Sequence, residues 1–489
     1  MKNLTKANLL QTLVYLVLML GSCGPREEVK EMNIKDIIGT HAQNLLDDTN
    51  AFATSISITK NGKTYTTHFG QIDKGKANKI TDTTLFEIAS VTKVFTGTLM
   101  ARAVVDGKIN LDDDIRKFLP GSYPNLEFQG QPIKVKDLLG FKSGINQKFP
   151  DVSHLRAIED DSTAFRLEEF GASYNKSHFF EDLEKVKLDT FPGTTSYYNE
   201  LCPELTGYIL EKVYQKDFRK IMKNELFDEL EMNSTFFTTP DSKSLLNGYN
   251  INEKLMPNFA YRIWGAGGML KSTIGDLNIF LRYHLKSDNK VVMESQKNIE
   301  NSISNWKGYL WDDISVTRNG LRCLKHGGGY GVQNMFVVYP EQNLGITMVI
   351  NQSAPNTHEK LMNTINSIVA DLSDLEQDHG ETYGYRIENE TIVFRYIHLE
   401  KLNHDLINSI SVAGTFNDWN PNNDMYQMNF LGNSTYELSV PLAHFQQGDT
   451  HEFRFVINEN SWLTVPQNIP NRTYSKRHNN ITLVLDGIP

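Results

Sequence analysis

Ser90 and Lys93 stand three residues apart in the sequence Ser90-Val91-Thr92-Lys93, a spacing that can create a covalent nucleophile. On a helix, residues i and i+3 share a face about one turn apart, so the Lys93 amine can lie beside the Ser90 hydroxyl. An amine held there can take the hydroxyl proton and activate the oxygen for attack on a carbonyl carbon. The pair is therefore the best candidate for a catalytic nucleophile and its base.

A helix that begins at Ser90 would position this pair. Apolar residues recur at helical spacing after Ser90, and Gly107 follows as a stop signal. Ser90 would then lie on the first turn, where free backbone N–H groups favour developing negative charge. Other Ser-x-x-Lys matches lie in strand-like or polar segments, where a surface serine near a solvated lysine is the simpler interpretation: Ser57 to Lys60, Ser173 to Lys176, Ser287 to Lys290 and Ser304 to Lys307.

Two further groups of residues could complete such a site. Tyr197-Tyr198-Asn199 follows the turn dipeptide Pro192-Gly193 and precedes a helical pattern, so Tyr197 could move a proton and Asn199 could hydrogen-bond an amide. The run that begins at His326 contains three glycines, which let a backbone approach a ligand closely. A packed aromatic cluster and a tight turn are the simpler interpretations of these two patterns.

Several other kinds of chemistry find no support in the sequence. The His326 run imitates the oxyanion loop of lipases, but the chain has no Gly-x-Ser-x-Gly nucleophile motif. Gly70 to Lys76 matches the letters of a phosphate-binding loop, yet Ala77 replaces the magnesium-binding hydroxyl. The formal charge of −10 argues against a nucleic-acid partner, and the 13 histidines and 3 cysteines form no metal-binding motif. We therefore predict neither a metal nor a cofactor.

The order of these motifs resembles the serine hydrolases of the class C β-lactamase and penicillin-binding-protein type, over about residues 40–370. The resemblance is carried by Phe86 to Lys93, Gly107 to Asp113, Leu138-Leu139 ahead of Ser143-Gly144, Pro192-Gly193 ahead of Tyr197 and Asn199, Ala266 to Met269 with Ser272-Thr273 and Asp276, and His326-Gly327-Gly328. It implies acyl transfer through an ester of Ser90, with Lys93 and Tyr197 managing the proton and Asn199 orienting the acyl part.

The same resemblance implies roles for the glycine-rich run. Backbone N–H groups of Ser90 and Gly329 would hold the oxyanion, and Gly328 would keep the strand edge open. His326 would face the substrate where typical β-lactamases have lysine, and a neutral imidazole binds a carboxylate less well than an ammonium does. The resemblance therefore favours an esterase or D-peptidase over a β-lactamase, with an ester, a D-amino-acid amide or a peptide as substrate.

The length of 489 residues favours more than one domain. Strand-like segments at both ends of residues 31–372, with helical patterns between them, predict an α+β domain whose antiparallel sheet is flanked by helices and a helical lobe. Residues 373–384 read as a polar linker. Short strands separated by Asn, Gly and Pro over residues 385–489 predict an all-β, immunoglobulin-like sandwich.

The N-terminus resembles a bacterial lipoprotein signal peptide over residues 1–23. Lys2 and Lys6 precede a short apolar run, and Gly21-Ser22 stands directly before Cys23, the expected lipidated residue. We therefore expect an exported lipoprotein of the cell envelope that contacts the membrane through its lipid anchor only. The remaining Cys202 and Cys323 are interpreted as unpaired thiols.

The C-terminal segment resembles the glycogen-binding module of AMP-activated kinase β subunits, over about residues 385–487. The resemblance implies that two tryptophans stack on sugar rings while a basic residue and an asparagine bind hydroxyls, and in this sequence these are Trp419, Trp462, Arg454 and Asn479. A spacer that packs on the hydrolase is the simpler alternative.

Three functions remain open from the sequence. The leading prediction is an exported serine hydrolase that acts on a small molecule or peptide, with a glycan as a possible further partner. The alternatives are a catalytically silent glycan or cell-wall binding protein and a sensor that penicillin acylates with little turnover.

Overall fold

The computed structural model describes residues 34–372 and 384–485, except 240–241, 261–262, 301, 303–304, 318–319, 389, 398–406, 433–434, 446–449, 464–471 and 476–479. The predicted signal peptide with Cys23, nearly all of the predicted linker and Asn479 lie outside the described residues.

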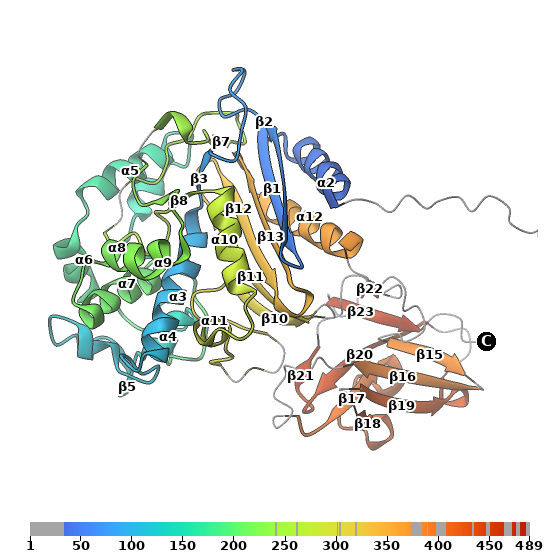
Figure 1. The fold of residues 1–489 in the computed structure, drawn as a ribbon. Helices are drawn as coiled ribbons and strands as arrows, with labels where there is room; N and C mark the ends of the chain where they lie inside the picture. The colour runs from blue at the N-terminus through green and yellow to red at the C-terminus, as the bar shows by residue number, and fades with distance from the viewer. Residues whose placement is uncertain are drawn as a thin grey trace, which may run out of the picture.

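A seven-stranded antiparallel sheet forms the centre of the larger region, in the order β2-β1-β13-β12-β11-β10-β9 (Figure 1). Its strands are β1 (Ala53–Lys60), β2 (Lys63–Gly70), β9 (Asn305–Trp306), β10 (Asp313–Thr317), β11 (Gly320–Gly328), β12 (Gln333–Tyr339) and β13 (Leu344–Ile350). Asn61 and Gly62, both with positive φ, form the tight turn between β1 and β2 that the sequence predicts. Because β1 pairs with β13, the early and late parts of this region lie side by side.

Helices cover both faces of this sheet. One face packs on α2 (Ile34–Thr49) and α12 (Thr357–Leu372) through a shared apolar cluster. The other face packs on α10 (Ile274–His284) and the helical lobe, through a second and larger cluster. The remaining helices are α3 (Thr92–Val105), α4 (Val135–Leu139), α5 (Thr163–Ser173), α6 (Lys176–Leu183), α7 (Leu201–Tyr214), α8 (Phe218–Met222), α9 (Asp228–Leu230) and α11 (Lys290–Ser295). The predicted α+β architecture is therefore confirmed.

Several short strands form small sheets of their own outside the central sheet. β3 (Leu85–Glu87), β8 (Lys271–Thr273) and β6 (Thr235–Phe236) form a small antiparallel sheet in the order β3-β8-β6. β4 (Glu127–Phe128) pairs with β5 (Gln131–Pro132), and β7 (Tyr249–Asn250) pairs in parallel with β14 (Gln352–Ser353). β3 matters most for function, because the chain enters the Ser90 turn directly from it.

The C-terminal region is all β, as predicted. One sheet has the order β15-β16-β19-β18 and the other β17-β20-β23-β22, with β21 on β20. Side chains from both sheets, among them Phe394 and Phe453, belong to one apolar cluster, so the two sheets share a core. The strands are β15 (Gly384–Glu388), β16 (Thr391–Ile397), β17 (Ile410–Gly414), β18 (Asn429–Gly432), β19 (Thr435–Pro441), β20 (His451–Ile457), β21 (Ser461–Trp462), β22 (Arg472–Ser475) and β23 (Asn480–Leu485). An immunoglobulin-like connectivity and the predicted domain limits stay predictions.

Within the described ranges, no helix is both long enough and apolar enough to cross a lipid bilayer. Cys202 and Cys323 are both buried, and they form no disulfide with each other.

Candidate active site

Ser90 lies in a single 3₁₀ turn, Ala89–Val91, between β3 and α3. The sequence predicts the first turn of the helix itself, and the structure differs only by this tight turn before α3 begins at Thr92. Ala89 has a φ of 45°, in the left-handed region that few residues with a side chain adopt. Such strained backbone is frequent at functional sites, and here it stands directly before the candidate nucleophile.

Lys93 lies beneath Ser90 with a side chain that is fully buried. Its Nζ donates to Ser90 Oγ at 3.0 Å and to the Gly267 carbonyl oxygen at 2.7 Å. It also pairs with Glu200, at 2.9 and 3.1 Å from the two carboxylate oxygens. The structure therefore brings Ser90 and Lys93 together as their spacing predicts, and adds a carboxylate that the sequence analysis did not foresee.

This carboxylate determines the charge of Lys93. Burial alone would lower the pKa of the amine, but the negative charge of Glu200 and the neighbouring Tyr198 outweigh burial and raise it above its ordinary value. Lys93 is thus an ammonium at neutral pH. An ammonium donates hydrogen bonds and stabilises negative charge, and it cannot accept the Ser90 proton as the expected amine base would.

Tyr198, and not the predicted Tyr197, reaches the nucleophile. The Tyr198 hydroxyl is hydrogen-bonded to Ser90 Oγ at 2.8 Å, and its ring stacks on Phe141 with centroids 4.8 Å apart. Tyr197 contacts the same region through its backbone, because its N–H donates to the Phe141 carbonyl oxygen. Consecutive side chains in this loop diverge, so the hydroxyl at Ser90 belongs to the second tyrosine.

Asn199 also differs from its prediction. Its buried amide donates to the Ile145 carbonyl oxygen, and its Oδ1 accepts the backbone N–H of Cys202 three residues later. This second bond is the kind that a capping side chain makes at the start of a helix, and α7 begins at Leu201. The carboxylate of the next residue, Glu200, lies beside Lys93.

Strand β11 presents Lys325 and Gly327 to the Ser90 turn. A Cβ atom on Gly327 would lie 2.4 Å from the Ile88 carbonyl oxygen, so only glycine allows β11 to approach this closely. Lys325 shares the same face because side chains alternate along a strand. Its Nζ bonds to Asp312 at 2.6 Å and lies 5.1 Å from the centre of the Tyr198 ring. A second ammonium is thereby placed beside Tyr198.

His326 faces the opposite side of the sheet, which contradicts its predicted role toward a substrate. It is hydrogen-bonded to Gln333. Its ring lies 4.6 Å from the ring of His358, the second residue of α12. Burial, aided by His358, lowers the pKa of His326 to about 4. The imidazole is therefore neutral at physiological pH and does not meet Ser90. The lysine that the sequence analysis found missing is its neighbour, Lys325.

On β11, the N–H of Gly328 faces the open edge of the strand, and the N–H of Gly329 does not. The Gly329 N–H is bonded to the Val332 carbonyl oxygen at 2.7 Å, so it is used within the turn between β11 and β12. Hydrogen-bonding direction alternates along an antiparallel strand, which turns the Gly328 N–H toward the other edge of β11. On that edge the ladder with β10 ends at the pair of Asp313 and Leu324, so β10 does not cover Gly328.

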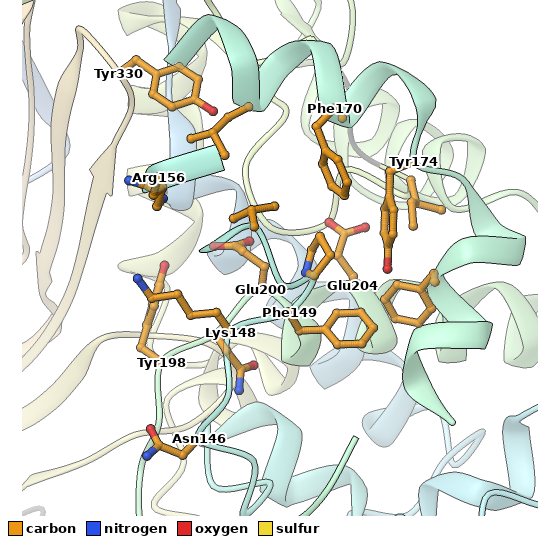
Figure 2. A pocket seen from close by; sticks show the side chains of 17 residues that line it. Asn146, Lys148, Phe149, Arg156, Phe170, Tyr174, Tyr198, Glu200, Glu204 and Tyr330 are labelled. Carbon is orange, nitrogen blue, oxygen red and sulfur yellow. The ribbon is translucent and has the colours of Figure 1, made fainter. Parts of the chain in front are cut away.

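A cavity of about 350 Å³ opens beside Tyr198. Figure 2 shows Glu200 and Glu204 between Tyr198 on one side and Phe170 and Tyr174 on the other. Among the described residues, no group of three or more His, Cys, Asp or Glu side chains is arranged to hold a metal ion.

Comparison with known proteins identifies this region. The family model named Beta-lactamase matches residues 39–370, which is more than half of the chain. The chain belongs to the β-lactamase family. This membership confirms the resemblance that the sequence shows, and it makes the larger region a β-lactamase-fold serine hydrolase domain.

Individual proteins with similar sequences include a β-lactamase. Protein flp of Staphylococcus aureus (strain N315) is 26% identical over 311 residues, which is 61% of this chain and 59% of the flp protein. A β-lactamase of Pseudomonas fluorescens is 25% identical over 224 residues, 45% of this chain and 55% of that protein. The chain thus spans less than two thirds of the length of these β-lactamase-family relatives.

Solved structures show the shared fold. A β-lactamase/D-alanine carboxypeptidase from Yersinia pestis gives a TM-score of 0.59 at 19% identity and covers 69% of this chain and 98% of that one. A class C β-lactamase gives a TM-score of 0.58 at 18% identity and covers 71% and 100%. The β-lactamase/transpeptidase-like architecture predicted from the sequence is therefore confirmed.

In the C-terminal region of this β-lactamase-family chain, three of the predicted glycan-binding residues lie together. The rings of Trp419 and Trp462 are 6.0 Å apart, and the Arg454 guanidinium lies 5.9 Å from the Trp462 ring. Arg454 also donates to the Leu463 carbonyl oxygen, which fixes its position.

Sequence reasoning missed Tyr198, Glu200 and Lys325. Two signals could have found Glu200 and Lys325. An asparagine just before a helical pattern is a typical capping residue, so the Asn199 amide is used by the backbone and the side chain of Glu200 is available to Lys93. A lysine two residues before a glycine in a strand shares its face, which links Lys325 to Gly327.

Proposed function

We propose that this β-lactamase-family protein is a serine hydrolase that forms an acyl-enzyme at Ser90, with an ester, a D-amino-acid amide or a peptide as substrate. One observation carries the proposal: Ser90 Oγ lies 3.0 Å from Lys93 Nζ and 2.8 Å from the Tyr198 hydroxyl. A serine with both neighbours, beside an uncovered backbone N–H, has the parts that acyl transfer needs.

Proton transfer is assigned to Tyr198. In its ionised form the Tyr198 oxygen takes the proton from Ser90 as Oγ attacks the carbonyl carbon, and it returns that proton to the leaving group. The ammonium groups of Lys93 and Lys325, each 5.1 Å from the Tyr198 ring centre, stabilise the negative oxygen. Water then attacks the ester carbon while Tyr198 takes one of its protons. Tyr198 gives this proton to Ser90 Oγ as the ester bond breaks, which restores the serine hydroxyl and releases the acid.

The oxyanion of both steps would be held by backbone N–H groups of Ser90 and Gly328. Such preorganised donors commonly contribute about 3 to 4 kcal/mol each to transition-state stabilisation. A β-lactam also remains a possible acyl donor in this proposal. The sequence argument against β-lactam hydrolysis depended on His326 facing the substrate, whereas His326 bonds to Gln333 and it is Lys325 that lies beside Tyr198.

Labelling and turnover together test the proposal. A fluorophosphonate probe should label the wild-type protein and not Ser90→Ala, while Ser57→Ala, a match to the same motif in β1, should label normally. Continued hydrolysis of a nitrophenyl ester excludes the silent binding protein. Stable labelling by penicillin without hydrolysis of esters or of a chromogenic cephalosporin would instead favour the sensor. Equal labelling of wild type and Ser90→Ala would refute the nucleophile assignment.

A second proposal concerns the C-terminal region, which we assign to glycan binding. It is supported by the Trp419 and Trp462 rings, which lie close together with Trp462 39% exposed. Aromatic faces suit the apolar faces of pyranose rings. In affinity electrophoresis through glycogen or amylopectin, Trp462→Ala should abolish retardation while Phe430→Ala, an exposed aromatic residue on β18, should retain it. If glycogen and amylopectin do not retard the wild-type protein, glycan binding is refuted and the C-terminal region is a spacer.

Export and a lipid anchor at Cys23 are proposed from the sequence alone. The anchor would place the hydrolase in the cell envelope. Metabolic labelling with a fatty-acid probe should mark the wild type and not Cys23→Ala, and equal labelling of both would refute the anchor.

A further inference from the structure

Apolar and aromatic side chains form much of the wall of the cavity beside Tyr198. Phe149 and Phe179 pack edge to face with centroids 5.0 Å apart and are almost fully buried. Leu167 and Phe170 of α5 add a second wall, and Tyr174 lies beyond them. The volume of about 350 Å³ lies at the low end of the roughly 300 to 1,000 Å³ typical of ligand pockets, which is room for one ring or a short chain.

The same cavity begins at the catalytic residues. Tyr198 forms its near wall and contacts Ser90 through its hydroxyl, and Glu200, the partner of Lys93, also lines it. Glu204 lies one helical turn further along α7, is buried, and accepts the backbone N–H groups of Trp264 and Gly267. An acyl group on Ser90 that extends into this cavity meets apolar walls, the two carboxylates, and the cationic side chains of Lys148 and Arg156.

Resting on the proposed function, we propose that this cavity is the acyl subsite and that the substrates carry an apolar acyl group of about butanoyl to phenylacetyl size. The acyl group stays bonded to Ser90 through both chemical steps, whereas the leaving group must depart before water attacks. A cavity that begins beside the nucleophile therefore suits the part that stays.

A series of nitrophenyl esters tests this subsite. Each methylene moved from water into the cavity is worth roughly a fourfold gain in kcat/KM, so hexanoate should exceed acetate by at least about tenfold.

Two variants of α5 and one matched control locate the effect. Leu167→Trp should fill the cavity and bring the ratio of hexanoate to acetate kcat/KM toward one, while Phe170→Ala should enlarge it and favour longer chains. Phe165→Trp changes a half-exposed residue on the same helix outside the cavity and should keep the wild-type ratio.

The outcomes separate this inference from the proposed function. A flat ester series in the wild type, with acetate hydrolysis still dependent on Ser90, would overturn the subsite alone. A chain-length effect in acetate esters of different alcohols, without one in the acyl series, would also overturn it. Loss of Ser90 dependence for every ester would overturn the proposed function itself.

Discussion

Replacing Glu200 by glutamine should leave the Lys93 ammonium buried without its counter-charge. Two unit charges 2.9 Å apart attract by about 1.4 kcal/mol in water and about 6 kcal/mol at an effective dielectric constant of 20. Because the Glu200 side chain is 45% exposed, the attraction lies toward the lower value, and we take about 2 kcal/mol. At pH 6 the variant should therefore lose about that much stability, a drop of a few degrees in the thermal midpoint.

The stability of Glu200→Gln should also depend on pH in a direction that follows from the pKa of Lys93. In the wild type the pKa of Lys93 lies above its ordinary value of 10.5, so its contribution to stability is constant from pH 6 to 9 and is lost only at higher pH. Without the Glu200 charge, burial becomes the main influence and lowers the pKa of Lys93. The folded variant then binds fewer protons than the unfolded chain, so its stability should recover as the pH rises.

Activity should change in the opposite direction. A neutral Lys93 no longer supports a negative Tyr198 oxygen, so kcat/KM of Glu200→Gln for nitrophenyl acetate should fall as the pH rises from 6 to 9. Thermal midpoints and kcat/KM measured at pH 6, 7.5 and 9 check both trends. Glu253→Gln is the control, because its carboxylate is similarly exposed but pairs with the exposed Lys74. A stability deficit in Glu200→Gln that is constant or grows with pH would refute this electrostatic account.

The other predictions concern single side chains around the same site. Tyr198→Phe should lower kcat/KM by roughly a hundredfold or more, since it removes a proton-transfer group. The control Tyr197→Phe should keep kcat/KM within a few fold of wild type, and equal losses in the two variants would contradict the assignment. Gly327→Ala should reduce activity at least about tenfold with a lower thermal midpoint, because its Cβ would lie 2.4 Å from the Ile88 carbonyl oxygen. The pKa of His326, lowered to about 4, predicts stability that is present above about pH 6.5 and lost as the pH falls toward 4. His326→Gln should therefore flatten the acid side of a thermal-midpoint profile, and an unchanged profile would contradict this reasoning.

Several helices, strands and turns of the larger region were predictable from hydrophobic periodicity and turn residues. The Asn61-Gly62 turn, the helix after Ser90 and the sheet closed by distant strands all appear where hydrophobic period and turn chemistry place them. The contact of Ser90 with Lys93 follows in the same way, because one helical turn relates them.

Three of the predicted residues each stand next to a residue whose side chain contacts Ser90, Lys93 or Tyr198. Tyr197 adjoins Tyr198, Asn199 adjoins Glu200, and His326 adjoins Lys325. In a loop or strand, neighbouring side chains point in different directions, so an error of one residue moves a functional group to another face. Tertiary packing settled each case, for example the stacking of Tyr198 on Phe141, and no local pattern encodes that contact.

The pairing of β1 with β13 has a consequence for when the hydrolase becomes active during synthesis. The Ser90 turn is translated early, whereas the β11 edge with Gly328 and the β13 strand that completes the sheet emerge more than 230 residues later. A growing chain therefore contains the Ser90 turn long before it contains the strand that brings Lys325 and Gly327 to that turn.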